Sequence, residues 1–164
     1  MRLVTVIVKK QDESVWDYPR PPRVETYPGL IAVRHNGCEL AKSSSTLRVL
    51  ETSHPPLFYI PFKDIIMELL LKTVRTSRCE FKGTAVYFDL VISVDKINNV
   101  AWSYENPERD YEAIKDHFAF YPSKLEACYV DGEKVKAQKG DFYGGWITFN
   151  IKGPFKGGPG TLNW

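Results

Sequence analysis

Apolar and polar residues alternate along much of this chain, which is typical of β-strands with one buried face. The clearest case is residues 84–94. One face of this segment is apolar and consists of Val86, Phe88, Leu90, Ile92 and Val94. Tyr87 and Asp89 lie on the other face. The pattern predicts a long strand here.

Two dipeptides predict tight hairpins. Asn36-Gly37 and Asp131-Gly132 each separate two short runs rich in β-forming residues. Asn-Gly and Asp-Gly favour the positive φ angles of a type I′ turn, which matches the twist of paired strands. We therefore expect an antiparallel hairpin at each position.

Asn98-Asn99 predicts a third turn, between the strand at 84–94 and a partner strand at 100–104. Trp102 and Tyr104 are two residues apart, so they share one face of that partner. This pair of strands is expected to present an aromatic surface.

Helical spacing of apolar residues is confined to a short stretch. In residues 63–72 the predicted buried stripe consists of Ile65, Ile66, Leu69 and Leu70. This spacing predicts the main helix. A second, short helical turn is expected at 108–115, because Pro107 can open a helix.

The ends of the chain differ from its middle. Prolines make residues 16–23 extended, and glycines and aromatic residues dominate residues 140–164. These patterns predict an extended N-terminal segment (1–24), a mainly β core domain (25–135), and a Gly/aromatic-rich C-terminal extension (136–164) that packs on the core.

Composition is that of one ordinary globular domain. The chain has 164 residues, of which 43% are hydrophobic and 26% charged. A net charge of +2 is too small to indicate a polyanionic partner, so no duplex nucleic acid is expected. The apolar start is interrupted at Lys9-Lys10, too soon for a signal peptide, and no run approaches a membrane span.

Cysteine and histidine usage argues against a metal centre. The three cysteines, Cys38, Cys79 and Cys128, are widely spaced and odd in number, which favours free thiols in a cytoplasmic setting. The three histidines are equally scattered, so no ligand cluster of the zinc type occurs. We expect no metal and no cofactor.

The first candidate functional residues lie in the segment 51–64, which connects two apolar runs. It combines Glu51, His54, Tyr59 and three prolines in one stiff, polar and aromatic segment, a type of segment that often carries binding groups. Glu51 could form a structural ion pair with Lys82. Alternatively, these two residues could flank a pocket together with Tyr59.

Cys79 is the candidate reactive residue. Arg78 and Lys82 would favour its thiolate, whereas Glu80 opposes them. A nucleophile and a buried, inert thiol are both open interpretations.

The one basic run lies near the expected aromatic strands and consists of Lys72, Arg75, Arg78 and Lys82. It could form a cationic rim beside a stacking platform made by Tyr87, Trp102 and Tyr104. Alternatively, it is a solvated charge run beside a packed aromatic core.

Several separated motifs resemble one family in the same order. They are the residues 51–53, 59–61 with Asp64, CEFKGTAVY at 79–87, AWSY at 101–104 with Pro107, and FAFY at 118–121. The resemblance is to the domain of unknown function 427 (DUF427) and covers roughly residues 24–135. The flanking segments, 16–25 and 143–164, resemble a longer, cyanobacterial-type version of the family.

The resemblance implies a compact, antiparallel β-tent-like (Mss4-like) fold, similar in shape to methionine sulfoxide reductase B and to the ligand-binding domain of cereblon. The zinc cysteines of those relatives are absent here. The family is also labelled a putative nucleotidyltransferase. This sequence lacks the Gly-Ser motif with paired aspartates that metal-assisted nucleotidyl transfer requires.

Three functions are expected from these residues. The first is binding of a small planar or anionic ligand in a pocket formed by Glu51, Tyr59, Lys82, Tyr87, Trp102 and Tyr104. The second is an enzyme in the same cleft, with Cys79 or Lys82 as nucleophile and Glu51 or Asp64 as acid/base. The third is a protein-interaction module through the aromatic tail at 142–164. A monomer or a homodimer is expected.

Overall fold

The computed structural model describes residues 10–140 and 142–164, which form an antiparallel, mainly β domain. The first nine residues, including the apolar start of the chain, lie outside the described range. The largest sheet has seven strands in the order β2 (Arg23–Tyr27), β5 (Thr46–Leu50), β6 (Leu57–Pro61), β10 (His117–Phe120), β9 (Asp95–Ser103), β8 (Gly83–Ile92) and β7 (Leu70–Cys79).

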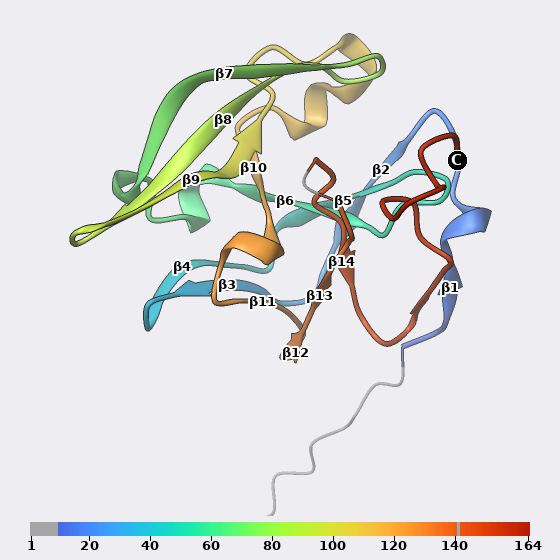
Figure 1. The fold of residues 1–164 in the computed structure, drawn as a ribbon, viewed down its shortest axis with the longest axis horizontal. Coiled ribbons are helices and arrows are strands. Elements are labelled where there is room, and N and C mark those ends of the chain that lie inside the picture. The colour runs from blue at the N-terminus through green and yellow to red at the C-terminus, as the bar shows by residue number, and fades with distance from the viewer. Residues whose placement is uncertain (1–9, 141) are drawn as a thin grey trace, which may run out of the picture.

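A second, four-stranded sheet lies below the long strands in Figure 1. Its order is β12 (Glu133–Lys134), β11 (Ala127–Val130), β3 (Ile31–His35) and β4 (Cys38–Ser43). Two short pairs complete the fold. They are β13 (Lys136–Ala137) with β14 (Trp146–Ile147), and the parallel pair β1 (Glu13–Ser14) with β15 (Ile151–Lys152).

Both faces of the large sheet are buried at its central strands. Phe88 and Leu90 of β8 belong to the main apolar core, which also includes residues of the four-stranded sheet. Tyr87, on the opposite face of β8, belongs to a second, aromatic-rich cluster with Trp102. The face of β8 that carries Tyr87 is therefore not solvated, and Asp89 on that face is only 7% exposed.

The hairpins at Asn36-Gly37 and Asp131-Gly132 are confirmed, and all four residues have positive φ. The turn predicted at Asn98-Asn99 is wrong, because both residues lie within β9 and the chain turns between Ile92 and Asp95. Asn99 has φ 51° at an irregularity of pairing, where its N–H donates to Asp89 Oδ1 over 2.8 Å. Asparagine tolerates left-handed backbone in a bulge as well as in a turn.

The helix predicted at 63–72 is also wrong. This stretch forms two short 3₁₀ turns, η2 (Phe62–Asp64) and η3 (Met67–Leu69), and then enters β7. Backbone pairing overrides the helical spacing, since the N–H of Ile66 donates to the carbonyl of Leu40 over 2.9 Å. The longest helical segment is instead η4 (Arg109–Ile114), at the site of the shorter predicted turn.

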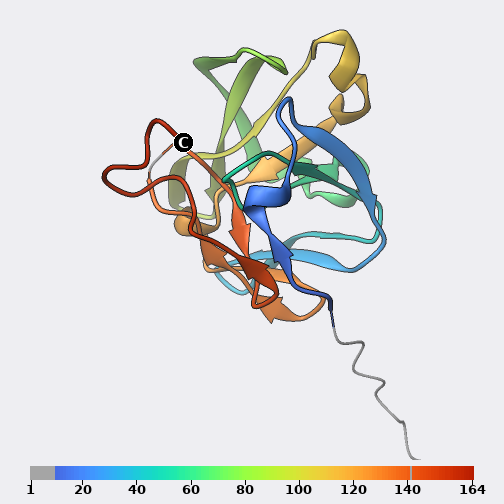
Figure 2. The same cartoon turned by 90° about the vertical axis from the view of Figure 1, so that its right-hand side faces the viewer.

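The remaining 3₁₀ turns are η1 (Val15–Asp17) and η5 (Pro122–Lys124). The turn η1 follows β1 near the described N-terminus, where β1 runs beside β15 of the C-terminal extension (Figure 2). Val15 is fully buried and packs in one small cluster with Leu50 and Ile151. The two flanks of the chain are thus joined to each other and to β5.

The C-terminal extension contributes a central core residue, Trp146. Its side chain is 1% exposed and packs against Phe58 with ring centroids 5.2 Å apart. Its indole Nε1 donates to the carbonyl of Phe120 over 3.0 Å. A residue outside the two large sheets thereby satisfies a carbonyl at the end of β10.

We expect Trp146→Ala to lower the free energy of unfolding by about 3–5 kcal/mol, because it removes a buried indole and leaves a cavity. Urea denaturation measures this change. Phe149→Ala is the control, since that side chain is 82% exposed and its loss should cost no more than about 0.5 kcal/mol. Equal, small effects of both variants would show that the extension is not part of the core.

Candidate functional site

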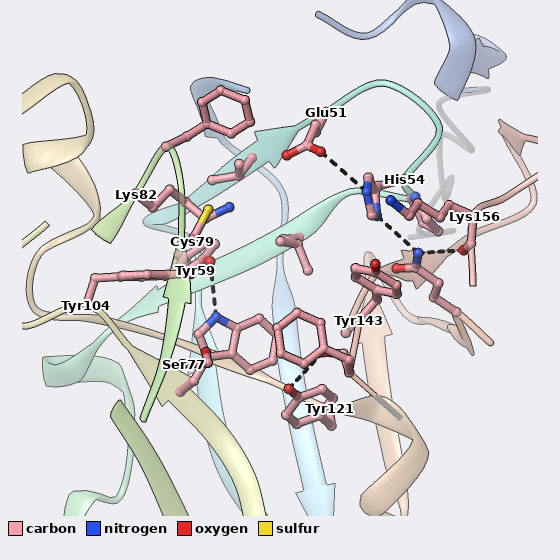
Figure 3. Close-up of a pocket in the computed structure, with 18 of the residues that line it drawn as sticks. Glu51, His54, Tyr59, Ser77, Cys79, Lys82, Tyr104, Tyr121, Tyr143 and Lys156 are labelled. Atoms are coloured by element: carbon pink, nitrogen blue, oxygen red, sulfur yellow. Dashed lines mark hydrogen bonds and ion pairs between the residues drawn. The ribbon is translucent and has the colours of Figure 1, made fainter. Parts of the chain in front are cut away.

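A cavity of about 210 Å³ lies against the aromatic face of the large sheet. All the predicted site residues line it, namely Glu51, Tyr59, Cys79, Lys82, Tyr87, Trp102 and Tyr104. Figure 3 shows Lys82, Cys79 and Tyr104 on one side of it, and His54, Tyr143 and Lys156 on the other. Asp64, the alternative acid/base, is not in the lining and instead accepts a hydrogen bond from Ser43 over 2.6 Å.

Strand register brings the aromatic residues together. Tyr87 of β8 is directly opposite Trp102 of β9, and Ala119 of β10 is opposite Trp102 on its other side. The small Ala119 side chain leaves room beside the indole. Tyr59 of β6 then reaches Trp102, whose Nε1 donates to the Tyr59 hydroxyl oxygen over 3.2 Å.

The tyrosine hydroxyls around this wall remain protonated. Burial is the main cause of the raised pKa of Tyr59 and of Tyr104, and at Tyr59 it outweighs the opposing effect of the hydrogen bond from Trp102. Burial likewise raises the pKa of Tyr121, whose hydroxyl donates to the carbonyl of Phe142 over 2.9 Å. These groups are therefore hydrogen-bond donors at any physiological pH.

Lys82 is the least expected group in the cavity, because it is only 6% exposed. Buried lysines are normally paired with an acid. Lys82 forms no ion pair or side-chain hydrogen bond with any residue in 10–140 or 142–164. Its ammonium nitrogen lies 5.9 Å from the centre of the Tyr104 ring.

The ion pair considered between Glu51 and Lys82 does not form. Glu51 Oε2 instead lies 3.2 Å from Arg20 Nη2 and 3.4 Å from His54 Nε2. Both Glu51 and Lys82 nevertheless line the cavity, so the pocket-flanking arrangement is the one observed.

The basic run does not form one continuous cationic rim. Lys72 pairs with Glu105, and Arg78 pairs with Glu108, with both partners exposed. Arg75 lies over the ring of Tyr87, 4.4 Å from its centroid. The cationic residues of the run that line the cavity are Arg78 and Lys82.

His54 has partners that sequence reasoning missed. Its Nδ1 lies 3.2 Å from the amide nitrogen of Gln138, and its ring contacts Tyr143 at a centroid distance of 4.9 Å. Both partners lie more than 80 residues further along the chain, in the C-terminal extension. The long-range pairing of that extension is not visible in local patterns.

The extension forms one wall of the cavity. Gln138, Tyr143, Gly144 and Lys156 all line it. Gly144 sits so close to the indole of Trp102 and the ring of Tyr121 that a Cβ there has no space. Glycine is therefore required where the extension crosses the aromatic wall.

Residues 23–131 match the family model described as a domain of unknown function, DUF427. The chain belongs to the DUF427 family. A search of curated proteins found no match. The matched region supplies Lys82, Glu51 and the aromatic wall of the cavity, whereas Gln138 and the rest of the extension wall lie outside it.

Among the residues of this DUF427 chain that the structure describes, no group of three or more His, Cys, Asp or Glu side chains is placed to hold a metal ion. Neither is any described helix long and apolar enough to cross a membrane.

The aromatic tail, expected alternatively to dock a partner, divides into two sets. Tyr143 and Trp146 are used within the protein itself. Phe142, Phe149 and Leu162 are 51%, 82% and 71% exposed. The docking hypothesis therefore depends on these three side chains and stays a prediction.

Glu51 has a lowered pKa despite its position in the cavity. Burial acts to raise the pKa, but the hydrogen bond from His54 and the charges of Lys82 and Arg20 outweigh it. The carboxylate form of Glu51 is consequently the form that the fold stabilises.

This arrangement predicts a pH-dependent effect of Glu51→Gln. The charged carboxylate stabilises the fold above the ordinary pKa of 4.5, and this contribution is lost as pH falls through the lower, folded-state pKa. The difference in unfolding free energy between wild type and variant should be constant near neutral pH and shrink in acid below pH 4.5. Urea titrations across this range measure it, with exposed Glu112→Gln as the control. A difference independent of pH would contradict the inferred role of Glu51.

Proposed function

We propose that the cavity binds a small, planar, anionic ligand. The observation that carries the proposal is the excess of hydrogen-bond donors around Lys82. Tyr104 has no hydrogen-bond partner among the described residues, and Tyr59 accepts from Trp102 but donates its own proton to none of them. The ammonium of Lys82 and these two hydroxyls therefore lack acceptors.

A ligand with anionic oxygens would supply those acceptors. The Lys82 side chain is mostly buried, and an anionic oxygen in the cavity would give its ammonium a partner where little water is present. Hydrogen bonds to charged groups contribute about 1.5–3 kcal/mol each. An anion is thus favoured over a neutral ligand of the same shape.

The volume of the cavity and its aromatic walls indicate a ligand with a single ring. An apolar cavity of about 150 Å³ accommodates benzene, so 210 Å³ is suited to one ring with a small substituent. Trp102 and Tyr121 place two neighbouring aromatic rings on the wall, with centroids 4.6 Å apart and planes inclined at 47°. A flat ligand would stack on this surface while its anionic group faces Lys82.

Benzoate and nitrobenzene test the proposal, since they share shape but differ in charge. For the wild-type protein we expect benzoate to bind roughly 10–100-fold more tightly than nitrobenzene in calorimetric titrations. Lys82→Met should remove this preference while keeping nitrobenzene binding, because methionine retains the apolar stem.

Lys134→Met is the matched control for that experiment, because Lys134 is exposed on β12 and does not line the cavity. Equal affinity of the wild-type protein for both probes, or benzoate preference that survives in Lys82→Met, would contradict the proposal.

A second candidate function is covalent chemistry at Cys79. The observation that favours it is the position of this half-buried thiol in the same cavity as the Lys82 ammonium. By contrast, Cys128 is buried in the apolar core, and burial raises its pKa to about 12.

We expect iodoacetamide to alkylate Cys79 on the order of 10-fold faster than Cys38, which is comparably exposed but outside the cavity, because the ammonium of Lys82 lines the same cavity as Cys79. Benzoate should slow the reaction at Cys79 only. Mass spectrometry of digested protein follows both sites. A Cys79 no more reactive than a model thiol would contradict this second function.

The cytoplasmic setting and the monomeric or homodimeric state of the protein stay predictions.

A further inference from the structure

We infer that the ligand is amphoteric: besides its anionic group it carries an N–H donor, which binds Glu51. This inference rests on the proposed function and assigns a chemical class to its ligand. The class is a single-ring aromatic amino carboxylate of the aminobenzoate type.

The two oxygens of Glu51 have different surroundings. Oε2 lies 3.2 Å from Nη2 of Arg20 and 3.4 Å from Nε2 of His54. Oε1 accepts no hydrogen bond from any residue of the described segments. The side chain is 20% exposed and lines the cavity, so an acceptor with negative charge faces the ligand space.

Glu51 and Lys82 thus carry opposite charges around one small cavity without contacting each other. Such charges attract strongly where water is scarce. Their separation is maintained because Arg20 and His54 hold the Glu51 carboxylate, while the main-chain oxygen of Lys82 accepts from the N–H of Glu108 over 2.9 Å. The space between them fits a molecule that presents an acceptor to Lys82 and a donor to Glu51.

Gln138 positions the Glu51 carboxylate through His54, which lies between the two side chains. The amide of Gln138 has a fixed orientation, because its Oε1 accepts from the N–H of Gly145 and its Nε2 donates to the carbonyl of Lys156. Its Nε2 therefore also faces His54 Nδ1 as a donor. His54 Nδ1 must accept, so the ring proton is on Nε2 and points to Glu51 Oε2.

This chain of contacts leaves Glu51 Oε1 as the free oxygen. Dashed lines in Figure 3 run from Glu51 to His54 and on to Lys156 through an unlabelled amide, which belongs to Gln138. Gln138 is 3% exposed and belongs to the C-terminal extension. It acts as a positioning residue, with no role in contacting the ligand's anionic group.

The three aminobenzoate isomers, compared with benzoate, test the inference by calorimetric titration. All carry the same carboxylate, and the amino group samples three positions relative to it. We expect at least one isomer to bind the wild-type protein roughly 10-fold or more tightly than benzoate, because its N–H donates to a charged acceptor.

Glu51→Gln and Glu51→Asp should both reduce that ratio to about 3-fold or less, the first by removing the charge and the second by withdrawing the carboxylate. Gln138→Leu should also reduce the same ratio, whereas a merely structural defect would weaken benzoate and the aminobenzoate alike and leave their ratio unchanged. Glu112→Gln, at an exposed site outside the cavity, is the matched control and should leave the ratio unchanged.

The outcomes separate this inference from the proposed function. If benzoate binds but no isomer exceeds it, or if both Glu51 variants keep the ratio, the amphoteric ligand is overturned and the anion site stands. If neither benzoate nor any aminobenzoate binds the wild-type protein, both are overturned. A ratio that falls in either Glu51 variant and in Gln138→Leu supports the inference.

Discussion

Burial of both faces of the central strands of the seven-stranded sheet is the constraint on which the rest of this structure depends. One face packs in the main apolar core, so residues such as Phe88 and Leu90 have no freedom to face a ligand. The other face is covered by aromatic side chains with polar tips, which can close a core and still offer hydroxyl groups to a cavity. A sheet with one solvated face would have no equivalent place to hold Tyr59 away from water.

Local alternation was sufficient to predict most of β8 and the shared face of Tyr87 and Trp102. Tyr87 and Trp102 face the same way because the side-chain period of a strand is two, and the register of β8 and β9 places them opposite each other. The hairpins followed from turn chemistry at Asn36-Gly37 and Asp131-Gly132. These features depend only on neighbours in sequence.

The features that sequence reasoning missed depend on distant partners. Ile65 and Ile66 have helical spacing, but pairing with the Leu40–Ala41 region decides their conformation. His54 has no partner nearby in sequence, and Gln138 reaches it only because the extension folds back over the aromatic wall. Propensity and spacing contain no information on such contacts, since these arise from packing.

The close approach of Gly144 to Trp102 has a consequence for ligand size. The extension lies directly on the indole, and the matched family region ends at residue 131, before the extension begins. A DUF427 domain of the same fold that ended there would keep the lysine and the aromatic wall but lack the opposite side of the cavity. It would present an open groove, able to accept bulkier molecules. The tryptophan equivalent to Trp102 would then be exposed to solvent. If the cavity binds a ligand as proposed, the extension would limit that ligand to a small molecule, and a side chain in place of Gly144 would push the extension away from Trp102 and relax this limit.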